Sequence, residues 1–172
     1  MKKLTFILSA AAMLFSISAM AVSPEDIVKS IDRYDKLYNM EAPAPIGLTN
    51  IDALAAKAKE AREHCLDIAL RANMIYVFTG GEIPEGYVYV GPDPTIEDCE
   101  MLLRRIEAQT KLVGDATQLA ANAAGDLKGI KPLQIGKANK SINTSKDIFA
   151  VVAEETAHQL DLIKTSMANL GK

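Results

Sequence analysis

Residues 51 to 75 form an apolar seam whose spacing restricts the fold of this chain more than any other feature of its sequence. The seam residues recur in alternating steps of three and four, and they are Ile51, Leu54, Ala58, Ala61, Cys65, Ile68, Ala72 and Ile75. This spacing puts them along one face of an α-helix and is typical of helices that pack side by side. We therefore expect a long helix that is capped by Thr49 or Asn50 and reaches Ile75 or Phe78.

Two other segments begin with good helix-capping residues and continue with helical periodicity. A helix is expected at about 24–40, with Ser23 as its N-cap and Pro24 in its first turn. Another helix is expected to begin with Asp93 or Thr95 as its cap, because both side chains can accept a hydrogen bond from the first turn. Both starts are followed by acidic residues, which favour the positive end of a helix dipole.

A fourth helical segment begins at Pro132 and shows an uninterrupted pattern from residue 143 onward. Gly136 is the position where an interruption of this helix would fall. Sustained helical patterning in four segments predicts an all-α protein, an up-and-down helical bundle of about four helices. We expect a single domain at 22–172, because its length suits one hydrophobic core.

The connector around residues 76–93 departs from the helical pattern. Two runs rich in β-branched and aromatic residues, "MIYVF" at 74–78 and "YVYV" at 87–90, flank a segment with three glycines and a proline. Either the runs pair as a short β-hairpin at the end of the bundle, or the first run completes the preceding helix. The seam that reaches Ile75 favours the second alternative.

The N-terminus has the organisation of a secretory signal peptide at 1–21. Two lysines precede an apolar run at 4–17, and small residues lie before a cleavage point between Ala21 and Val22. The run is shorter than the roughly 20 residues that a membrane span needs. We expect a periplasmic or secreted protein without a membrane span after signal cleavage.

The charge balance of the chain is mildly acidic. The formal net charge is −3, and removal of the two leader lysines takes it to −5. An acidic chain without a basic run offers no electrostatic footprint for nucleic acid, so no nucleic-acid partner is expected. The same balance argues against an anionic membrane surface as a partner.

The chain has only two cysteines, Cys65 and Cys99. Because an exported protein meets an oxidising compartment, we expect them to form a disulfide bond. The bond requires the second helix to extend about five residues, or ~7–8 Å, beyond the start of the third. Two buried free thiols are the alternative.

No catalytic motif is found in the sequence. It contains no Gly-x-Ser-x-Gly elbow, no Walker or Gly-x-Gly-x-x-Gly loop, and no His-Glu-x-x-His helix. We therefore expect a protein that is not an enzyme and that binds no cofactor.

The two histidines, His64 and His158, allow an alternative function as a metal- or small-ligand-binding bundle. Glu155 precedes His158 with the Glu-x-x-His spacing that di-iron carboxylate bundles use. The expected bundle geometry brings His64 to a similar height. A second such pair is missing, because Ala61 stands three residues before His64, and His158 falls on a face expected to be exposed. Two surface histidines paired with carboxylates are therefore the other interpretation.

Four of the seven tyrosines and phenylalanines of residues 22–172 lie in or beside the connector, and they are Tyr76, Phe78, Tyr87 and Tyr89. Aromatic residues are enriched at binding surfaces. These residues predict a non-enzymatic interaction or structural protein that binds a protein partner through the connector, with a structural cap as the alternative. In an extended "YVYV" the valines are expected to face the bundle and the tyrosines to face outward. The sequence leaves self-association open.

Overall fold

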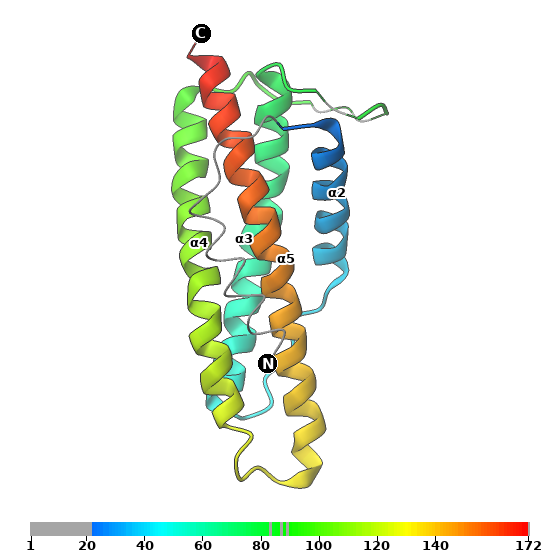
Figure 1. Cartoon of the computed structure of the whole chain (residues 1–172), viewed down its shortest axis with the longest axis vertical. Coiled ribbons are helices and arrows are strands. Elements are labelled where there is room, and N and C mark those ends of the chain that lie inside the picture. The colour runs from blue at the N-terminus through cyan, green and yellow to red at the C-terminus, as the bar shows by residue number, and fades with distance from the viewer. Residues whose placement is uncertain (1–21, 83, 87, 89, 172) are drawn as a thin grey trace.

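The computed structural model describes residues 22–82, 84–86, 88 and 90–171 (Figure 1). These residues form four α-helices, which are α2 (Pro24–Asn39), α3 (Thr49–Phe78), α4 (Ile96–Gly125) and α5 (Pro132–Leu170). No strand occurs among them, which confirms the predicted all-α helical bundle. The predicted leader at 1–21 lies outside the described residues. Within the described part of the chain, no helix is both long and apolar enough to cross a membrane.

The three long helices run alternately up and down the molecule, and the short helix α2 lies beside one half of the bundle (Figure 1). It packs against α3 and α5. The connector between α3 and α4 and the C-terminal end of α5 lie at one end of the bundle. The turn between α4 and α5 lies at the opposite end, which we call the basal end.

The caps of α2 and α4 are those that the sequence predicts. Ser23 and Thr95 each accept a hydrogen bond from the backbone N–H three residues later, at 3.3 and 3.2 Å. The aspartates at those later positions, Asp26 and Asp98, accept in return from the backbone of the capping residue, which completes two capping boxes.

The predicted cap of α3 is wrong. The N-cap residue is Leu48, which has no side-chain cap, so neither Thr49 nor Asn50 has that role. Asn50 instead donates its backbone N–H and its side-chain amide to the carboxylate of Asp126, at 2.8 and 2.7 Å. Asp126 follows the end of α4, so this contact ties the start of α3 to the end of α4.

Two hydrophobic clusters fill the interior. The basal cluster contains Leu54, Phe149 and Cys65, and the other cluster contains Leu102 and Cys99. Alanines occupy many of the seam positions and are buried, which lets the helices approach closely. α5 continues through Gly136 without the interruption that its glycine suggested.

The structure also decides the form of the connector. The run at 74–78 completes α3, as the longer seam indicated, and no hairpin is present in the described residues. Gly80 has a φ of 90°, a left-handed conformation that favours glycine, and it follows Thr79, the C-cap residue of α3. The N–H of Gly81 then donates to the Tyr76 carbonyl at 2.9 Å, which turns the chain back over the end of α3.

Candidate functional site

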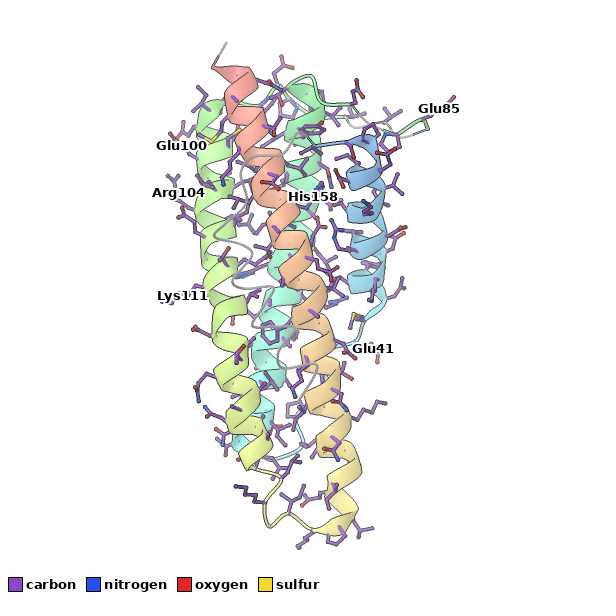
Figure 2. All side chains as sticks on the ribbon, in the orientation of Figure 1. Glu41, Glu85, Glu100, Arg104, Lys111 and His158 are labelled. Carbon is purple, nitrogen blue, oxygen red and sulfur yellow. The ribbon has the colours of Figure 1, made fainter. Side chains whose placement is uncertain are left out.

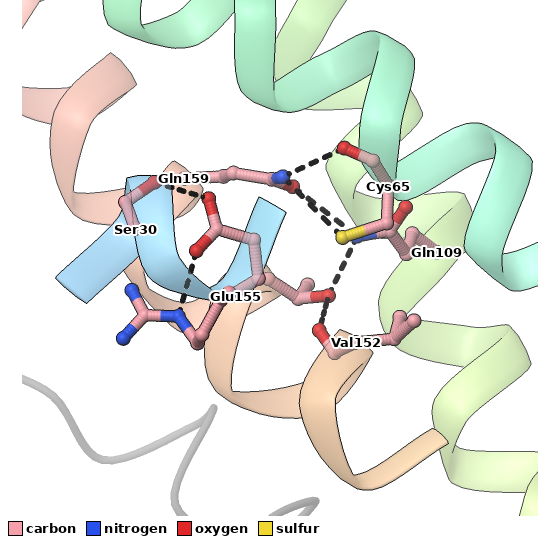
Figure 3. Close-up of polar contacts among 8 residues, drawn as sticks. Ser30, Cys65, Gln109, Val152, Glu155 and Gln159 are labelled. Carbon is pink, nitrogen blue, oxygen red and sulfur yellow. Dashed lines mark hydrogen bonds and ion pairs between the residues drawn. The ribbon is translucent and has the colours of Figure 1, made fainter. Parts of the chain in front are cut away.

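A buried polar layer separates the two hydrophobic clusters (Figure 3). On α4, the Gln109 amide donates to Thr156 at 2.6 Å and to the Gln159 side-chain carbonyl at 3.2 Å. Gln159 donates in turn to the backbone carbonyl of Cys65 at 3.1 Å. All four residues are fully buried, so the layer fixes the relative heights of α3, α4 and α5.

An ion pair between α2 and α5 adjoins this layer. The fully buried Glu155 carboxylate accepts from Arg33 Nε at 2.7 Å and from the Ser30 hydroxyl at 2.7 Å. Burial raises the pKa of Glu155, and Arg33 and Ser30 oppose that rise by stabilising the charged form. The pair holds α2 in one position, because the carboxylate has few other partners at this depth.

His158 is also buried, with Arg33 and Asp26 of α2 near enough to influence its charge, and Figure 2 shows it in the upper half of α5. Burial lowers the pKa of His158 to about 4, with a further contribution from Arg33. Its Nε2 atom has no hydrogen-bond partner among the described residues. The imidazole is therefore neutral near pH 7. The expectation of an exposed His158 is wrong, because the side chain is buried where α2 packs against α5.

The residues of the alternative metal site are not brought together. His64 is exposed on α3, whereas His158 is buried and Glu155 is engaged by Arg33. No group of three histidine, cysteine, aspartate or glutamate side chains in the described part of the chain is placed to hold a metal ion.

The predicted disulfide bond is also wrong, because Cys65 and Cys99 are free, buried thiols. Cys65 and Gln109 both contact Gln159, so they lie at about the same height in the bundle. Cys99 precedes Gln109 by ten residues on α4, or about 15 Å along the helix axis. A disulfide needs Cα atoms within about 7 Å. The predicted register of α3 against α4 was therefore incorrect. In the observed register, Arg105 of α4 forms an ion pair with Asp67 of α3 at 2.6 Å.

Both ends of the connector are held against the last turns of α3. A Cβ atom on Gly81 would lie 2.3 Å from the Tyr76 ring, and one on Gly91 would lie 2.8 Å from Met74 Sδ. Position 81 therefore needs glycine, because its backbone passes directly over the rigid, buried Tyr76 ring, whereas the flexible Met74 side chain could shift to admit a side chain at position 91. Tyr76 itself is only 4% exposed, and its hydroxyl donates to the Val22 carbonyl at 3.2 Å. Its predicted place on a binding surface is wrong, since the ring belongs to the core.

The tip of the connector extends away from the bundle, and Glu85 lies at its outermost part (Figure 2). Val88 and Val90 are 83% and 90% exposed, so the expectation that these valines face the bundle is wrong. Phe78 is half-buried. The predicted contact residues Tyr87 and Tyr89 lie outside the described residues.

A second surface, which the sequence analysis missed, lies at the basal end. A groove of about 490 Å³ runs between the α2–α3 linker and α5, and Lys137, Lys140 and Ser141 are among its lining residues. The signal was present in the sequence, because residues 127–146 contain five lysines and no acidic residue. The overall acidic balance concealed this local excess.

Comparison of the chain with known protein families, curated proteins and solved structures gives no match.

Proposed function

We propose that this protein is a non-enzymatic interaction protein of the bacterial envelope, which binds a protein partner through the tip of its α3–α4 connector. The observation that carries the proposal is the exposure of Val88 and Val90, at 83% and 90%. Covering these two exposed apolar side chains with another molecule costs little free energy. The close approach of the backbone to α3 at Gly81 and Gly91 supports the proposal, because it places the base of the tip at the end of the bundle.

The chemistry of the connector indicates the kind of surface that the partner presents. Residues 72–103 contain no basic side chain, and their acidic residues are Glu82, Glu85, Asp93, Glu97, Asp98 and Glu100. The partner surface is therefore an apolar depression that takes the valines, bordered by lysine or arginine side chains. The proposed roles of Phe78, Tyr87 and Tyr89 add aromatic area to the same contact.

The envelope location rests on the sequence of the leader. Export predicts that the mature chain begins at Val22, which N-terminal sequencing of the protein from its native host tests. Retention of Met1 on exported protein would contradict the assigned cleavage site.

Site-specific photo-crosslinking in living cells tests the connector directly. A photoreactive residue is placed at Val88 or at Val90, and a matched control carries it at Leu70, which is 53% exposed on α3. We expect the two connector positions to give the same covalent adduct and the control position to give none. Substitution of Glu82 and Glu85 by glutamine should weaken the adduct if the partner surface is basic. Absence of any adduct from the connector, or the same adduct from Leu70, would contradict the proposal.

A further inference from the structure

Exposed lysines gather at the basal end of the bundle, opposite the acidic connector. They lie in the α4–α5 turn and in the first turns of α5, and they are Lys128, Lys131, Lys137 and Lys140. None of them forms an ion pair with an acidic side chain of the described chain. The first turn of α5 has no acidic residue and no side-chain cap, so the positive end of the helix dipole adds to the same field.

The acidic groups near this end are largely engaged by backbone N–H groups. Asp126 accepts from Asn50, and Asp52 accepts from the N–H groups of Ile46 and Gly47 at 2.8 and 2.9 Å. Glu41 remains on the wall of the groove that Lys137 lines. The acidic residues of the connector lie at the other end of the molecule (Figure 1), separated by the 30 residues of α4, or ~45 Å, which is well beyond the ~8 Å over which charge is felt at physiological ionic strength. The net charge of the whole chain therefore does not describe this surface.

Two apolar side chains lie among these lysines. Leu133 is 93% exposed and Ile135 is 41% exposed, and both belong to the first turn of α5, between Lys131 and Lys137. An isolated exposed leucine is unremarkable on a protein surface. A fully exposed leucine at the extreme end of a helical bundle, bordered by unpaired lysines, has the composition of a surface that enters a membrane interface.

We infer that the basal end docks on an anionic lipid bilayer, with Leu133 inserted at the boundary between headgroups and acyl chains. Lys128, Lys131 and Lys137 contact the lipid phosphates around it, and the groove beside Lys140 accommodates a headgroup. A soluble anion would gain nothing from Leu133, which projects outward, and a nucleic acid would gain as little. The bilayer is the occupant that uses both the charge and the apolar tip.

Vesicle flotation tests this inference. The full chain is incubated with vesicles of phosphatidylcholine, or of phosphatidylcholine with one-third phosphatidylglycerol, and the bound fraction is measured at low and at high salt. Neutral vesicles are the essential reference, because any retained apolar leader would bind both kinds. We expect binding to the anionic vesicles only, and its loss at high salt.

Matched variants assign the binding to the basal end. Replacing Lys128, Lys131 and Lys137 by glutamine should lower the partition coefficient about 100-fold, at roughly fivefold for each lysine near the surface. The control replaces three exposed lysines elsewhere, Lys36, Lys111 and Lys164, and should bind nearly as the unchanged chain does. Leu133→Ser should lower binding about tenfold or more, whereas Leu70→Ser should not.

Three results of these experiments would overturn the inference, and two of them would identify a different occupant of the basal end. Equal binding to neutral vesicles, or none to anionic vesicles at low salt, would show that the basal end does not recognise an anionic bilayer. Full binding by Leu133→Ser, with displacement by inorganic phosphate, would indicate a site for soluble anions. Salt-sensitive oligomers of the protein alone, abolished by the lysine substitutions, would show that a second copy occupies this surface.

Discussion

The ion pair between Arg33 and Glu155 should be asymmetric, in that losing the arginine costs more than losing the carboxylate. Glu155 is 0% exposed, whereas the Arg33 side chain is 18% exposed. In Arg33→Met the carboxylate stays buried without its cation. Breaking a buried pair in this way costs about 3–5 kcal/mol. In Glu155→Gln the amide still accepts from Ser30, and Arg33 is near enough to solvent to be hydrated. We expect that variant to cost about 1–2 kcal/mol, near the value of a charged hydrogen bond.

The pH dependence of the Arg33→Met variant provides a second, independent readout. Burial already raises the pKa of Glu155 in the native protein, and loss of Arg33 removes the largest influence that lowers it. A carboxyl group whose pKa is raised by folding binds its proton more tightly in the native state. Its contribution to stability is therefore lost as pH rises through the raised pKa and is regained as pH falls. Arg33→Met should recover part of its lost stability between pH 7 and pH 5.

Urea unfolding followed by circular dichroism measures both effects. At pH 7 the Arg33→Met chain should show a clearly lower midpoint than Glu155→Gln, and its thermal midpoint should fall by about 10 °C. A variant with both substitutions should be more stable than Arg33→Met alone, because it contains no buried unpaired charge. Equal costs for the two single variants at pH 7, or no recovery at pH 5, would refute the reasoning.

Three further predictions concern buried groups and the connector. Lowering the pH from 7 to 4 should destabilise the protein through His158 by up to about 3 kcal/mol, since its pKa of about 4 in the folded chain lies below the usual 6.5. His158→Gln should lose that part of the pH dependence in unfolding titrations, and an unchanged profile would contradict the assignment. Neither cysteine should react with a thiol reagent in the native chain, and both should react after denaturation without reductant; a count of zero would restore the disulfide. Gly81→Ala should destabilise by about 1–3 kcal/mol because its methyl meets the Tyr76 ring. Gly114→Ala in α4, where nothing lies within 4 Å, should instead stabilise by about 0.5–1 kcal/mol, and similar effects at the two sites would contradict the packing of the connector.

The helices themselves were determined by local sequence. The capping boxes of Ser23 and Thr95 involve residues only three positions apart, so the chain needs no tertiary contact to specify those starts. The seam from Ile51 to Ile75 likewise determined which face of α3 is buried. Periodicity of this kind depends only on neighbouring turns of one helix, so a single sequence is enough to predict it.

The height of one helix against another was decided only by the tertiary structure. An apolar seam repeats every three or four residues, so sliding α4 along α3 by several turns preserves much of the apolar contact. The observed register places Cys65 beside Gln159 and near Gln109, because those polar groups must find partners once they are buried, and it separates Cys99 from Cys65. That requirement links three helices that are distant in sequence, which is why the disulfide was mispredicted.

The tertiary structure also decided which candidate residues are buried and which are exposed. His158 is buried, with Arg33 and Asp26 of α2 near enough to influence its pKa, and Val88 and Val90 are exposed on a connector whose backbone comes close to α3 side chains at 81 and 91. The lysines of residues 127–146 were visible in the sequence as a charge run. Only the fold shows that four of them, Lys128, Lys131, Lys137 and Lys140, share one end of the bundle with Leu133 while the acidic connector lies at the other, because composition sums charges that the helices hold far apart.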